Sequence, residues 1–268
     1  MLSNSFSLSA YPHYSGLPEQ NMLYRIKRYL RKIAGLQEAV PSKLSPKESE
    51  LISRIRSERL TYLSDRKLTS LVNTCRAIEE SNLSGIFLES GCALGGSAIL
   101  IASLKSSERP LFIYDVFGMI PSPTQDDTQD THDRYQTIVE GKSEGIGGDK
   151  YYGYEENLYE IVQSNLKSFG INCEQQSVLL IKGLVKDTMK LDQPIAFAHI
   201  DVDWYEPVMT CLKCVFPNLV VGGSIILDDY HDWGGCRKAT DEYLCGVTGQ
   251  FVLDDSADSM KITKINSY

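Results

Sequence analysis

The sequence predicts an α/β fold in which a doubly wound, mostly parallel seven-stranded sheet has a reversed strand at one edge. Short apolar runs alternate with amphipathic segments between residues 85 and 245, which is typical of parallel strands joined by helices. Residues 250–265 instead have the pattern of a hairpin, which predicts an antiparallel end to the sheet. Several of the apolar runs also end in acidic residues, as functional strand ends often do.

The composition is that of a globular protein with a sizeable core, since 42% of its 268 residues are hydrophobic. No apolar run is long enough to span a bilayer, and residues 1–10 lack the basic and apolar regions of a secretory signal. A net charge of −8 argues against nucleic acids and anionic membranes as partners. Seven cysteines without a regular spacing fit a reducing compartment, so we expect a cytoplasmic protein.

A helical extension and cap over residues 1–80 is expected to precede the sheet domain of residues 81–268. Within it, residues 20–34 form a basic amphipathic pattern. We expect this helix to cover a subunit or domain surface, and contact with a membrane surface is the alternative.

Two further helices are predicted before the first strand. Ser45 and Glu48 have the spacing of a capping box, with Pro46 at the first helical position, which predicts a helix to about residue 59. Ser64 is the expected cap of the second helix, over residues 65–80.

The sheet domain is predicted from apolar runs, glycines and helical periodicity taken in order. Residues 116–154 lack periodicity and contain many Gly, Asp, Thr and Ser residues, so we expect a lid or binding loop there. The other predicted elements are strands at 85–89, 110–115, 178–182, 195–200 and 224–227, helices at 97–104, 155–169, 206–215 and 235–244, and hairpin strands at 250–253 and 260–265.

Two of the predicted strands end in pairs of acidic residues. Asp201 and Asp203 follow one strand, and Asp228 and Asp229 follow the next. Because ligands bind outside the carboxyl ends of strands in open α/β sheets, we expect all four to converge. Several carboxylates together repel unless a cation or a shared proton intervenes, and Mg²⁺ prefers oxygen ligands. A divalent metal site is therefore predicted, with helix caps or turns as the alternative use of these acids.

A glycine-rich turn between the first strand and its helix predicts a cofactor site. Residues 89–97 read Glu-Ser-Gly-Cys-Ala-Leu-Gly-Gly-Ser, so Ala93 stands where the dinucleotide-binding pattern has its second glycine. Glu89 would repel a phosphate and attract a positive charge, and Asp115 is placed to accept hydrogen bonds from ribose hydroxyls. These residues favour a positively charged cofactor with a ribose and no phosphate, such as S-adenosylmethionine, over NAD.

Three motifs together resemble the macrocin-type sugar O-methyltransferases, the family of mycinamicin- and novobiocin-like enzymes. They are residues 88–97, residues 201–206 and the stretch from Asp228 to Asp241. The resemblance covers roughly residues 58–245 and implies a class I methyltransferase fold that uses S-adenosylmethionine and Mg²⁺. It also implies a small-molecule acceptor from natural product biosynthesis, a glycoside or deoxysugar, and a homodimer or higher homo-oligomer.

The resemblance further implies roles for individual residues. Asp201, Asp228 and Asp229 correspond to metal ligands and Asp203 to the general base, with Asp201 as the alternative base. His231 is a backup base. The alternative, which we favour, is that His231 faces solvent in a loop and takes no part in catalysis. The implied cofactor contacts are Thr61, Glu89, Gly91, Ser97, Asp115 and Gly183.

Two other functions remain open from the sequence. A hydroxylase-like member of the same fold would need an iron site, commonly two histidines and a carboxylate, and only His199 and His231 lie near the acids. A non-catalytic module that binds S-adenosylmethionine would tolerate loss of the four acids, all of which are present.

Overall fold

The seven-stranded sheet predicted from the sequence is the centre of the molecule. The computed structural model describes residues 44–266, so the predicted extension up to residue 43, including the helix at 20–34, lies outside the described residues. The strands are arranged in the order β3-β2-β1-β4-β5-β7-β6. Their bounds are β1 (Ile86–Ser90), β2 (Leu111–Asp115), β3 (Val178–Lys182), β4 (Ile195–Ile200), β5 (Leu219–Leu227), β6 (Phe251–Asp254) and β7 (Met260–Lys264).

The pairing of the strands confirms the doubly wound, mostly parallel sheet. β1 to β5 pair in parallel, and β7 is antiparallel to both β5 and β6. The reversed strand is therefore β7, one place in from the edge that β6 forms. In the register of β4 and β5, Ile200 pairs with Leu227, so Asp201 and Asp228 leave the sheet side by side.

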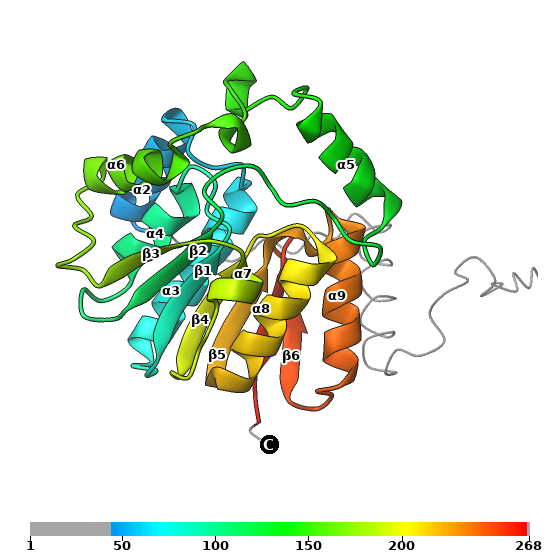
Figure 1. Ribbon diagram of the computed structural model, residues 1–268. Coiled ribbons are helices and arrows are strands. Elements are labelled where there is room, and N and C mark those ends of the chain that lie inside the picture. Colours follow the sequence, from blue (N-terminus) through cyan, green and yellow to red (C-terminus); the bar gives the residue numbers. More distant parts are fainter. Residues whose placement is uncertain (1–43, 267–268) are drawn as a thin grey trace, which may run out of the picture. The chain divides into compact units, whose positions relative to one another are not determined.

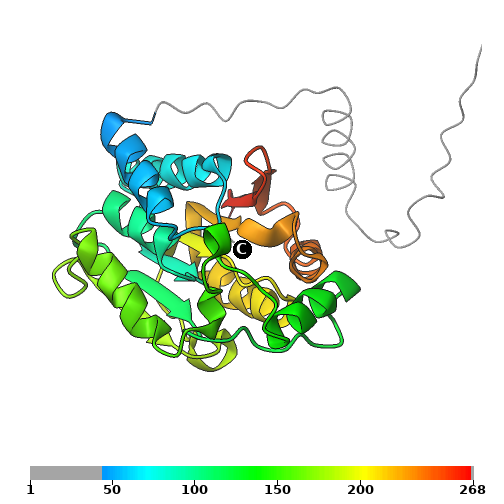
Figure 2. The same ribbon diagram turned by 90° about the horizontal axis from the view of Figure 1, so that it is seen from above.

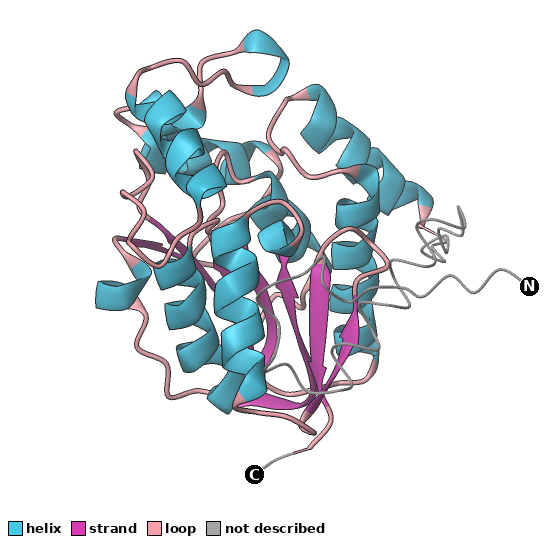
Figure 3. Cartoon of the chain, turned by 90° about the vertical axis from the view of Figure 1, so that its right-hand side faces the viewer, coloured by secondary structure: helices cyan, strands magenta, loops and turns pink. Residues whose placement is uncertain are grey.

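Helices cover both faces of the sheet (Figures 2 and 3). α3 packs on α4, β4 and β5, while α8 packs on β4, β5 and α9. No helix within residues 44–266 has the length and apolar content to cross a membrane. The first layer contains α2 (Pro46–Ser57), α3 (Asp65–Glu80), α4 (Gly96–Leu104) and α6 (Leu158–Ser168), and the second contains α7 (Val185–Thr188), α8 (Tyr205–Asn218) and α9 (Gly234–Cys245).

The two helices before β1 begin where their capping residues predict. The Ser45 hydroxyl accepts from the Glu48 backbone N–H at 3.3 Å, and the Glu48 carboxylate accepts from the Ser45 N–H at 2.6 Å. Ser64 likewise caps α3 by accepting from the Lys67 N–H at 3.3 Å. Both helices share one hydrophobic core with β1 and α4, so the caps also fix how α3 approaches the sheet.

The segment of residues 116–154 contains regular structure that the sequence analysis missed. It forms α5 (Gln129–Val139) and the 3₁₀ turns η2 (Ile146–Gly148) and η3 (Tyr152–Tyr154). α5 buries only Thr131 and Ile138, so its sequence shows no continuous apolar stripe. The helix packs against α9. Tertiary contact, not amphipathic periodicity, stabilises this helix. The segment crosses above the carboxyl ends of the strands (Figure 1).

Candidate active site

The four acids at the ends of β4 and β5 line one pocket. Asp201 and Asp203 enter it from the β4–α8 turn, and Asp228 and Asp229 from the turn η4 (Asp228–Tyr230) that follows β5. The pocket has a volume of about 380 Å³, which suits a small molecule. The convergence expected from the sheet topology is therefore present.

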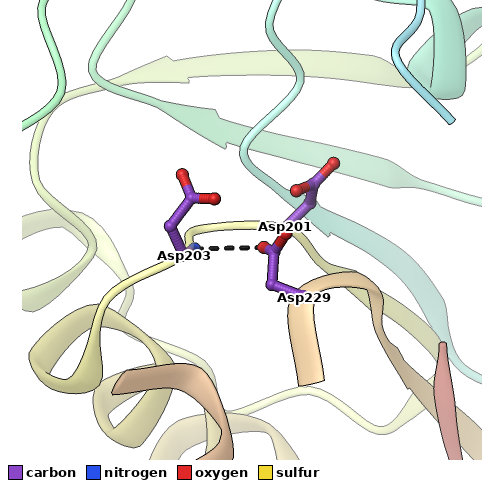
Figure 4. A group of neighbouring side chains, drawn as sticks. All are labelled: Asp201, Asp203 and Asp229. Carbon is purple, nitrogen blue, oxygen red and sulfur yellow. Dashed lines mark hydrogen bonds between the residues drawn. The ribbon is translucent and has the colours of Figure 1, made fainter. Parts of the chain in front are cut away.

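Three of these acids form a group that we call the open acid group: Asp201, Asp203 and Asp229. One carboxylate oxygen from each lies within 4.8 Å of the others, as Figure 4 illustrates. The Asp203 backbone N–H donates to Asp229 Oδ2 at 3.2 Å, which joins the two turns. Asp203 itself has a φ of 56°, a left-handed conformation that is unusual for a residue with a side chain.

The protonation of the open acid group reflects its crowding. Burial raises the pKa of Asp201 to about 8, and the charge of Asp228 adds to the effect. Burial and the charge of Asp228 also raise the pKa of Asp203 to about 6. The pKa of Asp229 is well above its usual range, because of burial and the charges of Asp203 and Asp201. These carboxylates therefore lack sufficient positive charge from the protein to ionise together near neutral pH.

Asp228 and Asp232 have a different environment, and we call them the lysine-paired acids. Lys67 Nζ, from α3, lies 2.9 Å from Asp228 Oδ2 and 2.8 Å from Asp232 Oδ2. Burial disfavours the ammonium, but the two carboxylates outweigh it and raise the pKa of Lys67. Asp228 Oδ1 is buried and has no hydrogen-bond partner in the part of the chain that the structure describes. The sequence analysis did not identify Lys67, since no spacing in the sequence relates residue 67 to residue 228.

Most of the predicted cofactor residues line the same pocket. Thr61, Gly91, Ser97, Asp115 and Gly183 all line it. Asp115 accepts from the backbone N–H groups of Cys92 and Phe117, each at 2.7 Å, so its carboxylate holds the glycine-rich turn against β2. Burial raises the pKa of Asp115 despite these hydrogen bonds.

Gly91 connects the two sides of the pocket. It has a φ of 80°, and a Cβ at this position would lie 1.8 Å from the carbonyl oxygen of Asp201. Only glycine permits this close approach of the turn to the end of β4. Ala93, with a φ of 46°, also adopts a left-handed conformation in the turn.

Glu89 is the exception among the predicted cofactor residues. Its side chain is fully buried, it does not line the pocket, and Glu89 Oε1 lies 3.0 Å from His199 Nδ1. Glu89 and His199 pair across β1 and β4 in the sheet register. The pair lies behind the pocket wall, so a contact between Glu89 and a cofactor stays a prediction.

The segment over the pocket is attached to the two helices that follow the acids. Asp127 Oδ1 accepts from the Tyr205 N–H at 2.7 Å, at the start of α8. Asp130 Oδ2 accepts from the Gly234 N–H at 3.0 Å, at the start of α9. A carboxylate that receives the free N–H groups of a helix start stabilises both partners. These two bonds position α5 above the acids.

Aromatic and basic side chains complete the pocket. Trp204, which is 2% exposed, donates to the Pro121 carbonyl at 2.9 Å and packs edge-on against Trp233. Arg134 of α5 also lines the pocket, and the sequence analysis missed it together with its helix. The expectation for His231 was wrong, because its side chain is only 13% exposed, against Asp255, and it does not line the pocket.

Comparison with protein families gives one match over most of the chain. The family model described as macrocin-O-methyltransferase (TylF) matches residues 55–246. This range contains the glycine-rich turn and all the acids of the pocket.

Two curated relatives are similar to this chain in sequence, and one solved structure is similar to it in fold. The demethyldecarbamoylnovobiocin O-methyltransferase of Streptomyces niveus is 26% identical over 191 residues, which are 68% of this chain and 67% of that protein. The mycinamicin III 3''-O-methyltransferase of Micromonospora griseorubida is 26% identical over 194 residues, covering 68% and 69%. The structure of the O-methyltransferase NovP aligns with a TM-score of 0.65 at 22% identity, covering 77% of this chain and 83% of that one.

Proposed function

Because the chain belongs to the macrocin O-methyltransferase family and is an O-methyltransferase, we propose that it methylates a hydroxyl of a sugar or glycosylated small molecule. S-adenosylmethionine is the proposed methyl donor, and Mg²⁺ is the proposed metal cofactor. The observation that carries the proposal is the position of the open acid group beside the glycine-rich turn in one pocket. A methyl donor and an acceptor hydroxyl could meet there. The names of the relatives, which methylate antibiotic compounds, support an acceptor from natural product biosynthesis.

The donor set of the acids fits a divalent cation. Three carboxylate oxygens within 4.8 Å of one another repel in the absence of positive charge, and burial together with the charge of Asp228 raises the pKa values of Asp201 and Asp203. We propose that Asp201, Asp228 and Asp229 hold the cation. Asp228 can take part although Lys67 occupies its Oδ2, because no described residue forms a hydrogen bond with its buried Oδ1. A bound divalent cation supplies Lewis-acid chemistry, which makes a nearby hydroxyl more acidic.

Asp203 is the proposed general base. It lines the pocket, and its pKa, raised to about 6 by burial and by Asp228, makes it a better proton acceptor than an ordinary aspartate. Its left-handed backbone and the hydrogen bond from its N–H to Asp229 fix where the carboxylate stands. The geometry also admits Asp203 as a third metal ligand in place of Asp228, in which case Asp201 or a water would accept the proton.

The proposed reaction is a displacement at carbon. The acceptor oxygen forms a bond to the methyl carbon, the carbon–sulfur bond breaks, the sulfonium becomes a neutral thioether, and the hydroxyl proton passes to Asp203. The glycine-rich turn with Thr61, Ser97 and Asp115 would bind the donor, and the lid residues would exclude water. Holding the two reactants in line can supply about 7–11 kcal/mol of the barrier reduction.

A hydroxylase-like function is less well supported. Among the described residues no histidine lines the pocket, since His199 is buried against Glu89 and His231 stands against Asp255. A site of two histidines and one carboxylate therefore has no suitable donors beside the acids.

The experiment that tests the proposal combines binding with turnover. We expect calorimetry to show that S-adenosylmethionine binds without added Mg²⁺, and mass spectrometry to show the gain of one methyl group on a glycoside acceptor only when Mg²⁺ is present. Turnover that is unaffected by a chelator would contradict the role of the metal. Absence of cofactor binding would contradict the whole proposal.

A further inference from the structure

The charges that line the pocket include one cation, Arg134, that forms no ion pair with a carboxylate among residues 44–266. The basic residues of the lining are Lys67, Arg134 and Lys186. Lys67 pairs with the lysine-paired acids, and Lys186 Nζ lies 3.1 Å from Glu206 Oε1. Arg134 makes no hydrogen bond or ion pair to a carboxylate within residues 44–266. Its guanidinium instead faces the ring of Tyr151, with Cζ 5.6 Å from the ring centroid.

The position of Arg134 is fixed by contacts on both sides of it along α5. Asp130, Arg134 and Ile138 are spaced four residues apart and so share one face of the helix. Asp130 accepts from the N–H of Gly234, and the carbonyl of Ile138 accepts from the hydroxyl of Tyr154 at 2.6 Å. Ile138 is buried and also lines the pocket. Arg134 is therefore presented to the pocket by a helix that is attached at both of its ends.

Arg134 lies on the acceptor side of the pocket. Arg134 lines the pocket together with Asp203, the proposed base, and it comes from α5, which Asp130 joins to the start of α9. The glycine-rich turn, Asp115 and Gly183 lie instead at the ends of β1, β2 and β3, and Thr61 lies between α2 and α3. A group bound at Arg134 would consequently belong to the acceptor.

Aromatic rings beside Arg134 form a surface suited to a sugar. The ring centroids of Tyr151 and Tyr152 are 4.5 Å apart, and that of Tyr62 lies 5.9 Å from Tyr152. All three residues line the pocket; Tyr62 is 49% exposed and Tyr151 only 4%, so Tyr62 presents the most accessible ring. Apolar faces of a sugar ring pack on such rings, while the planar fork of a guanidinium matches the paired oxygens of a phosphate or carboxylate.

We propose that Arg134 binds an anionic group of the acceptor, so that the substrate is a sugar carrying a phosphate or a carboxylate and not a neutral glycoside. This inference rests on the proposed function, because it assigns the class of acceptor for the same site. The tyrosines contact the ring, and the guanidinium of Arg134 donates to two oxygens of the anion. Lys67 and Lys186 do not compete for that anion, since carboxylates of the protein already occupy them.

The test compares acceptors that share one sugar ring: a neutral methyl glycoside, the sugar 1-phosphate and the corresponding uronate. The variants are Arg134→Gln, Arg134→Lys, which keeps the charge without the fork, and Lys142→Gln. Lys142 is the matched control, because its side chain is 70% exposed and lies outside the pocket lining. The thermal midpoint and the affinity for S-adenosylmethionine establish that each variant is folded.

We expect the parent protein to methylate the phosphate or the uronate with a higher kcat/KM than the neutral glycoside, and the preferred acceptor identifies the anion. Arg134→Gln should lower kcat/KM for that acceptor by about 10- to 100-fold, mainly through KM, the range for a lost hydrogen bond to a charged group. The loss for the neutral glycoside should be much smaller than the loss for the anionic acceptor, Arg134→Lys should recover part of the latter, and Lys142→Gln should match the parent. A preference for the neutral glycoside, or an equal loss for all three acceptors, would overturn the inference.

A binding measurement separates this inference from the proposed function. Calorimetry with S-adenosylhomocysteine present follows the binding of each acceptor without methyl transfer. If no acceptor is methylated, the proposed function fails, yet tighter binding of the phosphate or uronate by the parent than by Arg134→Gln still supports the role of Arg134. Equal binding by the parent and the variant overturns that role whether or not methylation occurs.

Discussion

The open acid group and the lysine-paired acids lie at the ends of the same two strands but differ in their positive charge. Lys67 bridges Asp228 and Asp232, whereas Asp201, Asp203 and Asp229 form no ion pair with a lysine or arginine within residues 44–266. Asp228 and Asp229 are adjacent in the sequence and still fall on different sides of this division. Lys67 neutralises Asp232 and the Oδ2 atom of Asp228 and so supports the fold, while the open acid group, together with Asp228 Oδ1, is suited to binding a cation.

The largest expected effect comes from replacing the proposed base. Asp203→Asn should lower kcat by about 10²–10⁴-fold, the usual contribution of general acid–base catalysis, because the amide cannot accept the hydroxyl proton. Asp232→Asn, in the lysine-paired acids, should have a much smaller effect. Steady-state kinetics with saturating cofactor measure both, and calorimetry should find cofactor affinity retained. Similar losses in the two variants would remove the distinction between the two groups of acids.

The second-largest effect is expected in the glycine-rich turn, which packs against Asp201 of the open acid group. Gly91→Ala places a Cβ 1.8 Å from the Asp201 carbonyl oxygen, so the turn and the end of β4 must separate. We expect a loss of about 3 kcal/mol in unfolding free energy together with weaker cofactor binding. Gly170→Ala is the matched control, with a similar φ of 78° and no atom within 4 Å of the added Cβ.

Chemical denaturation measures both variants. Gly170→Ala should lose only about 1–2 kcal/mol, the cost of a left-handed conformation for a residue with a side chain. Equal losses at the two positions would show that the close approach at Gly91 is not what matters.

The stability of the metal-free protein should depend on pH through the open acid group. Asp201 and Asp203 have folded-state pKa values raised to about 8 and about 6 from an ordinary 3.8, so the folded state binds more protons than the unfolded state between these values. Their stabilising contribution is therefore fully present below the ordinary pKa and is lost as the pH rises through about 6 and then about 8.

Mg²⁺ should reverse that loss. A cation at 100 times its Kd stabilises the folded state by about 2.7 kcal/mol, and we expect the increase in thermal midpoint to be larger at pH 8 than at pH 6. Thermal unfolding in chelator and in Mg²⁺ at the two pH values measures this increase in thermal midpoint. A midpoint that rises with pH in chelator, or that ignores Mg²⁺, would contradict the assignment.

The smallest expected effect is on the lysine-paired acids. Lys67→Met leaves Asp228, whose side chain is 8% exposed, without its counter-charge, and should lower the unfolding free energy by about 2 kcal/mol. Lys186→Met is the control, because Lys186 and Glu206 are 47% and 46% exposed and such pairs contribute at most about 1 kcal/mol. Denaturant titration compares the variants. If Asp228→Asn fails to recover stability in the Lys67→Met background, the pair is not the cause.

Much of the fold could be predicted because its signals are local. The capping box of Ser45 and Glu48 and the apolar runs of β1 to β5 each require only a few neighbouring residues. α5 could not be predicted, since the bonds of Asp127 and Asp130 to the starts of α8 and α9 join residues about 80 to 100 positions apart. Arg134 was missed for the same reason, because its place in the pocket follows only from the position of α5.

The sequence by itself determined that four aspartates follow two adjacent strands and that a glycine-rich turn follows a third, since strand ends and tight turns are local consequences of residue order. Only the tertiary structure decided how these groups are charged and which way they face. It brought Lys67 to Asp228 across 161 positions, buried Glu89 against His199, and left Arg134 facing the pocket. Electrostatic interactions depend on distances in space, and the order of residues along the chain does not specify those distances.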